Sequence, residues 1–291
     1  MAEDNFDLNF SSVEERATQY NARASVPDFD ACVAEYARLA IEVKSQCPGI
    51  CDLRYGQGVA NRLDLFPVTL ERQPAPLFVF IHGGYWRAQT KEDAPIMAKA
   101  FTDAGIAVCT LEYTLLPEAT LGETVREMRS ALAWLYRNAG LYGVDPGRIY
   151  VGGSSAGGHL AAMLAASGWQ ERFSLPDNVI KGMLSLSGLY DLQPLCGINV
   201  NEWLQLHPEQ ARRLSPLFQL PPADTPVVLA VGGLETDGFK NQTSAYEAAC
   251  RAQGLAVRRV DTPQCNHFDL LCELHDPRSD LAKATFEMIH A

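Results

Sequence analysis

The chain contains, near its middle, the stretch Gly152-Gly153-Ser154-Ser155-Ala156-Gly157-Gly158-His159. It follows a short apolar run at 148–151 and precedes a helix-like apolar run at 160–164. The spacing Gly153-x-Ser155-x-Gly157 is typical of a nucleophile elbow, in which glycines allow a tight strand-to-helix turn that exposes a serine hydroxyl. The stretch therefore predicts an α/β fold with Ser155 as the nucleophile. A plain glycine turn between a strand and a helix is the alternative interpretation.

Around this stretch, apolar runs alternate with helical patterns. Continuous apolar runs are typical of parallel strands buried on both faces, and their alternation with helices predicts a mostly parallel, doubly wound sheet. Alternating runs at 51–55 and 62–66 predict an antiparallel hairpin at one edge, for about eight strands in all. The other predicted strands cover 77–81, 106–111, 149–151, 183–186, 227–231 and 256–260. The predicted helices cover 29–43, 91–104, 121–139, 157–167, 239–253 and 279–290.

We expect residues 1–291 to form one domain. Residues 1–48 are predicted to form an N-terminal arm, laid over the surface up to about residue 27, and a first helix outside the sheet. The proline-rich segment from about 189 to 222 is the longest insertion between predicted strands. Long insertions of this kind often cover a site, so we expect a cap there.

Composition limits the classes of partner and compartment. The net charge of −11 and the lack of a Lys/Arg cluster argue against a nucleic-acid partner. The acidic N-terminus does not resemble a secretory signal, and no apolar run approaches the roughly 18 residues of a membrane span. We therefore expect a cytoplasmic protein without a membrane partner. A monomer and a homodimer are both left open.

The eight cysteines of such a chain are expected to be free thiols. Four potential zinc ligands lie close together, but their spacing fits no familiar zinc pattern, so no metal is expected. These ligands are Cys265, His267, Cys272 and His275.

Enzymes with parallel sheets carry their chemistry in the loops beyond the carboxyl ends of the strands. After the strand at 77–81 comes His82-Gly83-Gly84-Tyr85-Trp86, which matches the HGG-type loop of lipases and esterases. The backbone N–H groups of Gly83, Gly84 and Ala156 are predicted to form an oxyanion hole. His82 is expected to hold the loop. Tyr85 and Trp86 are predicted either to line an aromatic substrate pocket or to pack in the core.

Two carboxylates follow the strand at 227–231, where the acid of a catalytic triad would lie. Glu235 is closer to the end of the strand and is preferred over Asp237, the alternative acid. Asp191, which follows the preceding strand, is a third candidate.

The base is expected to be His267, which follows the last strand. In this fold the nucleophile, the acid and the histidine come in that order along the chain, and His267 is the histidine that satisfies it. His267 would accept the Ser155 proton, the acid would orient the imidazole, and water would hydrolyse the acyl-enzyme, so no cofactor is needed. The histidines that this order or their position excludes are His82, His159, His207, His275 and His290.

These motifs resemble those of the kynurenine formamidase (arylformamidase) group of α/β-hydrolases, which is similar to the hormone-sensitive-lipase-type esterases. The resemblance covers most of the chain and implies a triad of Ser155, Glu235 and His267. One departure is that the family acid is commonly aspartate, whereas this chain has glutamate at 235. The motifs that carry the resemblance are Gln19-Tyr20-Asn21, His82 to Trp86, Gly153 to His159, Ser187-Gly188-Leu189-Tyr190-Asp191-Leu192, Ser215-Pro216 and His267-Phe268-Asp269.

The sequence thus predicts a serine hydrolase with a small-molecule ester or amide as its substrate. The leading hypothesis is cleavage of a small acyl group from an aryl amide, because the resemblance implies N-formylkynurenine as substrate. The first alternative is a carboxylesterase acting on short-chain esters. A second is a ligand-binding homologue that has lost catalysis.

Overall fold

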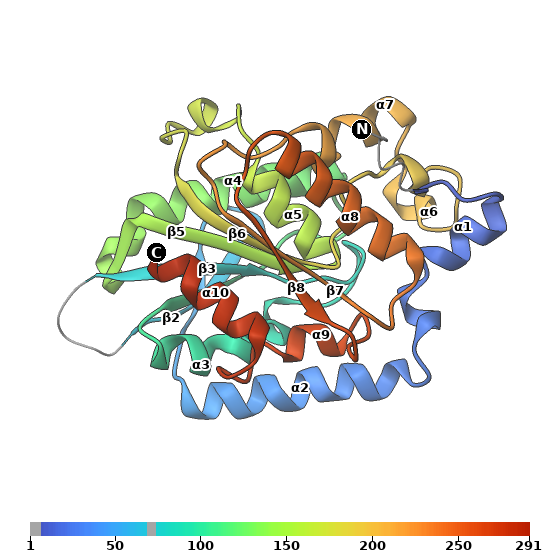
Figure 1. Ribbon diagram of the computed structural model, residues 1–291. Helices are drawn as coiled ribbons and strands as arrows, with labels where there is room; N and C mark the ends of the chain where they lie inside the picture. Colours follow the sequence, from blue (N-terminus) through green and yellow to red (C-terminus); the bar gives the residue numbers. More distant parts are fainter. Residues whose placement is uncertain (1–6, 69–73) are drawn as a thin grey trace.

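The computed structural model describes residues 7–68 and 74–291. Within them, eight strands form one sheet in the order β1-β2-β4-β3-β5-β6-β7-β8 (Figure 1). β1 and β2 pair in an antiparallel manner at one edge, β2 is also antiparallel to β4, and all other neighbours are parallel. The predicted doubly wound sheet with an edge hairpin is therefore confirmed. The strands are β1 (Ile50–Arg54), β2 (Arg62–Phe66), β3 (Ala75–Ile81), β4 (Ala107–Leu111), β5 (Val144–Ser154), β6 (Ile180–Leu186), β7 (Val227–Gly232) and β8 (Val257–Thr262).

Helices cover both faces of the sheet. The helices α4, α5 and α8 lie on one face, and α2, α3 and α10 lie on the other (Figure 1). The α-helices are α1 (Val13–Gln19), α2 (Phe29–Gln46), α3 (Ala98–Asp103), α4 (Leu121–Asn138), α5 (Ala156–Ala165), α6 (Asn201–Leu204), α7 (Pro208–Arg213), α8 (Asp237–Ala252), α9 (Asp269–Cys272) and α10 (Asp280–His290). Short 3₁₀ helices are η1 (Ala22–Ser25), η2 (Lys91–Asp93), η3 (Pro95–Met97), η4 (Ala139–Tyr142), η5 (Gln170–Phe173), η6 (Gln193–Leu195) and η7 (Pro216–Phe218).

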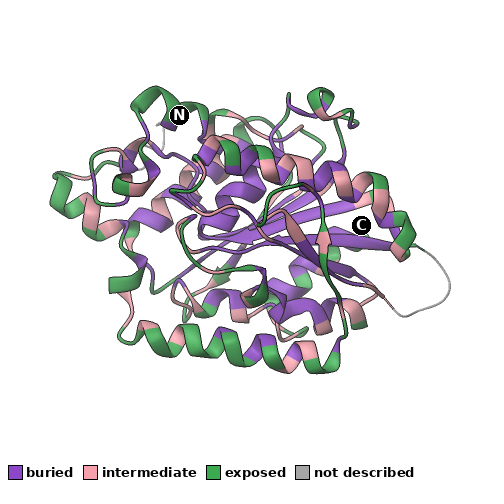
Figure 2. Ribbon diagram, turned by 180° about the vertical axis from the view of Figure 1, so that it is seen from behind, coloured by how far each residue is buried: buried purple, intermediate pink, exposed green. Residues whose placement is uncertain are grey.

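The side chains of β3 show how the sheet divides the core. Leu77, Val79 and Ile81 pack on the side of α4 and α5, whereas Phe78 and Phe80 pack on the side of α3 and α10. This alternation follows from the two-residue period of a strand. Figure 2 shows the result, with buried strands between helices whose outward faces are exposed. The continuous apolar runs of the sequence therefore correspond to strands with two buried faces.

The predicted helix over 91–104 is wrong in its first half. The structure has η2 and η3 there, and α3 begins only at Ala98. Pro95 has no backbone N–H, so it cannot donate the hydrogen bond that would continue an α-helix through this point. The N–H of Lys91 is also held by a side chain, because it donates to Glu112 Oε2 at 3.1 Å.

The N-terminal arm contains more regular structure than the sequence predicted. Ser12 caps α1, because its hydroxyl accepts a hydrogen bond from the N–H of Glu15. The arm then contacts α8, where the Gln19 side-chain oxygen accepts from the N–H of Gly238 at 3.1 Å. Among the described residues, no helix is both long and apolar enough to cross a membrane.

Candidate active site

Ser155 lies between the end of β5 and the start of α5, in the middle of the sheet. Its backbone has φ 57° and ψ −119°, a conformation that residues other than glycine rarely adopt. A Cβ atom on Gly153 would lie 2.2 Å from the carbonyl oxygen of Gly157, and one on Gly157 would lie 2.0 Å from that of Ile81. Both glycines of the motif are therefore required by close backbone contacts, and the turn has the geometry of a nucleophile elbow.

Glu235 and His267 form a buried pair. The Nδ1 atom of His267 lies 2.6 Å from Glu235 Oε2, and both residues are at most 4% exposed. The other carboxylate oxygen accepts hydrogen bonds from the Ser187 hydroxyl at 2.5 Å and from the N–H of Gly232 at 2.6 Å. These donors compensate the cost of burying the carboxylate. Because an ionised carboxylate only accepts, Nδ1 donates and Nε2 of His267 is left to accept a proton.

The two other candidate acids lie in different surroundings. Asp237 is exposed and begins α8. Asp191 is buried, but its carboxylate accepts hydrogen bonds from Gln193 and Ser215. Of the three carboxylates, Glu235 is the one that the structure places against His267.

The glycine loop after β3 lies beside Ser155. A Cβ atom on Gly83 would lie 3.5 Å from the Cβ of Ser155. Gly84 has φ 89°, and a Cβ there would lie 2.2 Å from the carbonyl oxygen of Ala88. Ala156 is the first residue of α5, so its N–H has no partner within the helix. The three predicted oxyanion donors thus come from two backbone segments that meet at Ser155.

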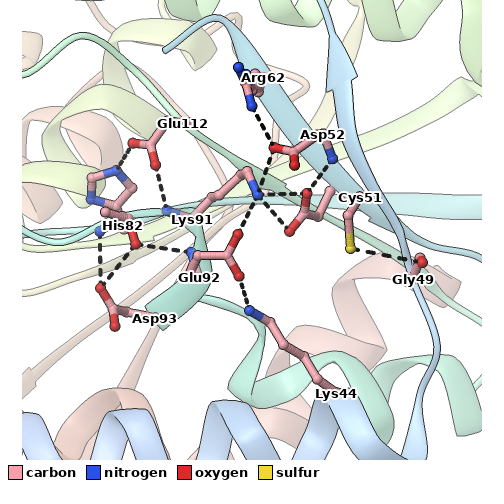
Figure 3. A network of polar contacts seen from close by, with 12 residues as sticks. Lys44, Gly49, Cys51, Asp52, Arg62, His82, Lys91, Glu92, Asp93 and Glu112 are labelled. Atoms are coloured by element: carbon pink, nitrogen blue, oxygen red, sulfur yellow. Dashed lines mark hydrogen bonds and ion pairs between the residues drawn. The ribbon is translucent and has the colours of Figure 1, made fainter. Parts of the chain in front are cut away.

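Glu112, just after β4, holds both ends of this loop. Its Oε1 accepts from His82 Nε2 at 3.0 Å, and its Oε2 accepts from the N–H of Lys91 at 3.1 Å (Figure 3). Tyr113 adds a second clamp, because its ring stacks on that of His82 at 4.2 Å and its hydroxyl donates to the Gly83 carbonyl at 3.0 Å. His82 therefore has the structural role that the sequence predicted.

The buried Lys91 connects the end of this loop to the edge of the sheet. Its Nζ lies 2.8 Å from Asp64 and 2.5 Å from Glu92 (Figure 3). Burial alone would lower the pKa of Lys91, but the hydrogen bonds to Asp64 and Glu92 raise it above its usual range. Lys91 therefore stays charged, and its ion pairs fix the place where the loop ends.

Tyr85 and Trp86 have different roles. Tyr85 lines the cavity in front of Ser155. Trp86 is fully buried, does not line that cavity, and packs edge-on against the His159 ring at 5.1 Å. Both residues have a positive φ, 50° and 57°, and their rings pack edge-to-face with centroids 5.9 Å apart, so Tyr85 lies between Trp86 and the cavity. For Trp86 the predicted pocket role is therefore corrected to a core role.

A cavity of about 670 Å³ brings the candidate groups together. It is lined by Ser155, His267, Gly83 and Gly84, and its size is in the range of small-molecule sites. The hydrogen bonds of the described residues join His267 to Glu235 and not to Ser155. Contacts between a nucleophile and its base often tighten only when substrate binds. The described residues contain no group of three or more potential ligands that would suit a metal ion.

Comparison with known proteins places the chain in a family. The BD-FAE family model matches residues 63–237, which is more than half of the chain. The kynurenine formamidase of Salmo salar is 30% identical over 82% of this chain and 82% of its own length. The chain belongs to the BD-FAE family and is a kynurenine-formamidase-like α/β-hydrolase. The kynurenine formamidase of Danio rerio is 28% identical over 99% of this hydrolase and 97% of its own length.

A solved structure agrees with this assignment. A protein from Silicibacter sp. TM1040, described as a candidate thioesterase, superposes on the hydrolase with a TM-score of 0.78 at 29% identity. The match covers 94% of this hydrolase and 98% of that chain.

Several residues that line the hydrolase's cavity were not predicted as site residues. The arm contributes Tyr20 and Asn21, α2 contributes Val33 and Tyr36, and the segment 189–222 contributes Trp203. The spacing of Val33 and Tyr36 also fits a helix face packed on a core, so it does not distinguish the two roles. The motif Gln19-Tyr20-Asn21 was a usable signal, because it carried part of the family resemblance.

Proposed function

We propose that this enzyme is a serine hydrolase in which Ser155, His267 and Glu235 form the catalytic triad. The supporting observation is the 2.6 Å contact between His267 Nδ1 and Glu235 at the wall of a cavity that the elbow serine also lines. His267 Nε2 accepts the Ser155 proton as the hydroxyl attacks the carbonyl carbon, and Glu235 stabilises the imidazolium that forms. The N–H groups of Gly83, Gly84 and Ala156 bind the oxyanion.

The proposed substrate is an aryl formamide of the N-formylkynurenine type. After attack, His267 returns its proton to the leaving arylamine, and water then releases formate from Ser155. Two relatives named kynurenine formamidase, each matched over most of its length, support this choice. The aromatic wall of the cavity, which includes Tyr85, Tyr36 and Trp203, suits an aryl leaving group.

A short-chain ester is the second candidate substrate. The likeness to a candidate thioesterase favours it, because a thioester, like an ester, has a leaving group that needs less protonation than an arylamine. The same triad serves both reactions.

The test compares wild type with Ser155→Ala on N-formylkynurenine and on p-nitrophenyl acetate. We expect wild type to prefer the formamide and Ser155→Ala to lose about 10³-fold or more in kcat on both substrates. Ser167→Ala is the matched control, because Ser167 is an exposed serine soon after α5. A fluorophosphonate should label Ser155 in wild type, as peptide mass spectrometry would show. Turnover of the ester alone would favour the esterase, and full activity in Ser155→Ala would overturn the proposed nucleophile.

A further inference from the structure

Arg87 lies at the cavity, three residues after Gly84. Its guanidinium lies 4.3 Å from the centroid of the Trp203 ring, and both residues line the cavity. Trp203 is held in turn by the loop that carries Gly83 and Gly84, because its Nε1–H donates to the Tyr85 carbonyl at 3.1 Å. The cation therefore rests on an aromatic platform that is fixed to the proposed oxyanion loop.

The positive charge of Arg87 has no ion-pair partner among the described residues. Within residues 7–68 and 74–291, no carboxylate lies at ion-pair distance from it. The carboxylate that lines the cavity belongs to Asp93, and it already accepts from the N–H of Thr90 at 3.0 Å. A free cation at the site is notable in a chain with a net charge of −11.

A second arginine lines the same cavity. Arg23 of η1 lies over the Phe29 ring at 4.2 Å, and its contact with Asp30 is a long one of 3.9 Å between exposed side chains. Such an exposed pair contributes little. The two arginines of the cavity wall thus face a single carboxylate there, that of Asp93, and positive charge is left over.

Arginine is suited to bind a carboxylate, because its planar group donates two parallel hydrogen bonds and stacking on an aromatic ring fixes its orientation. We propose, on the basis of the proposed function, that Arg87 on Trp203 forms a subsite for a carboxylate carried by the leaving group of the substrate. The enzyme then selects aryl amides and esters with an anionic leaving group over neutral ones of the same shape.

The experiment uses two acetate esters with the same acyl group and the same type of phenol. One is 3-(4-acetoxyphenyl)propanoate, which is anionic, and the other is its neutral propanamide. We expect wild type to show at least a tenfold higher kcat/KM for the anion, mainly through KM. Arg87→Met, which keeps the apolar stem, should lose this preference, because its kcat/KM should fall about tenfold more for the anion than for the neutral ester. Arg87→Lys should retain part of the preference.

Arg212→Met is the matched control. Arg212 also stacks on an aromatic ring, Phe218 at 3.9 Å, and is exposed, but it does not line the cavity. It should keep the full preference, which excludes an effect of net charge alone. Binding of both esters to Ser155→Ala, measured by calorimetry, gives the same comparison without turnover.

No preference in wild type, or a preference that survives in Arg87→Met or falls equally in Arg212→Met, would overturn the subsite. Hydrolysis of the neutral ester in that case would leave the proposed function intact. Failure of both esters to react, with tighter calorimetric binding of the anion that Arg87→Met removes, would instead support the subsite and contradict the hydrolase chemistry.

Discussion

Glu235 and Asp237 lie two residues apart after β7, and their surroundings differ sharply. Glu235 is buried and contacts His267, Ser187 and the N–H of Gly232, whereas Asp237 is exposed. In a triad, the acid fixes the tautomer of the histidine, so its contact with the ring matters more than its distance from the strand.

We therefore expect Glu235→Gln to lower kcat by about 10³–10⁴-fold, because an amide can donate to Nδ1 and stabilise the wrong tautomer. Asp237→Asn is the matched control and should stay within about twofold of wild type. Steady-state kinetics on p-nitrophenyl acetate and N-formylkynurenine would measure both. Equal losses in the two variants, or a larger loss in Asp237→Asn, would contradict the assignment of the acid.

His159 is a second residue whose surroundings decide its behaviour. It is fully buried after the elbow, and its Nε2–H donates to the Leu214 carbonyl at 2.7 Å. Its Nδ1 has no hydrogen-bond partner among the described residues. Burial lowers the pKa of His159 to about 4, since a charged imidazolium would lose its hydration there.

The lowered pKa predicts a loss of stability in acid. Below pH about 6.5 the unfolded chain binds a proton at His159, whereas the folded protein does so only near pH 4. The free energy of unfolding should therefore fall as the pH decreases through this window, by up to about 3 kcal/mol from this residue.

Urea unfolding at pH 7, 6, 5 and 4.5 would measure the slope. His159→Gln, which keeps a donor for the Leu214 carbonyl, should show a shallower slope, and His290→Gln, at an exposed position, should not. A slope in His159→Gln as steep as in wild type would show that other groups cause the acid sensitivity.

At the scale of elements, the connection after β4 sets the position of the loop 82–91. One carboxylate, Glu112, binds a side chain at the start of that loop and a backbone N–H at its end. The loop contains Gly83 and Gly84, which lack side chains of their own to hold it. We infer that Glu112 is a positioning residue for the proposed oxyanion donors.

Glu112→Gln removes one of the two acceptors and should release one end of the loop. We expect kcat to fall about tenfold with little change in KM, since misplaced donors weaken binding of the transition state more than that of the substrate. Affinity for a boronic acid that mimics the tetrahedral intermediate should fall in parallel. Glu118→Gln, an exposed carboxylate in the same connection, serves as control. A change in thermal stability alone, with normal kcat, would show that the contacts of Glu112 with the loop serve only the stability of the fold.

For the molecule as a whole, the N-terminal arm forms part of the cavity wall, although it lies far from Ser155 and His267 in the sequence. Gln19 contacts the start of α8, and the Tyr85 hydroxyl donates to the Tyr20 carbonyl. The arm also supplies Tyr20, Asn21 and Arg23 to the cavity wall. The shape of the cavity therefore depends on how closely the arm approaches α8.

Gly238→Ala tests this contact. The new Cβ would lie 2.6 Å from the Gln19 carbonyl oxygen, so the arm must shift. We expect the free energy of unfolding to fall by about 1–3 kcal/mol, KM to rise severalfold, and trypsin to cleave faster after Arg16 and Arg23. Gly122→Ala is the control at the same position of α4, with open space around it, and should be neutral or slightly stabilising. Normal KM and normal cleavage in Gly238→Ala would show that the arm tolerates the shift.

How much the sequence could predict depended on the distance over which each feature is encoded. Gly153, Ser155 and Gly157 lie within five residues, so the elbow was readable, and the order of Ser155, Glu235 and His267 selected the proposed base. Tyr85 and Trp86 are neighbours in one turn, and no periodicity distinguishes the one that faces the cavity. Residues of the arm and of the segment 189–222 line the cavity only because distant segments of the chain come together, and local sequence patterns do not encode such contacts.

The hydroxyl of Tyr36 in α2 donates to the carbonyl of Phe268, the neighbour of His267. The two partners lie 232 positions apart in the sequence, so during synthesis α2 emerges from the ribosome long before the loop that it anchors. His267, the proposed base, can reach its place only after the chain has been made past Phe268. A circular permutant opened between α2 and this loop would reverse the order in which the two are made while keeping the anchor. In the order given by the sequence, the capacity to hydrolyse a substrate arises long after α2 has formed.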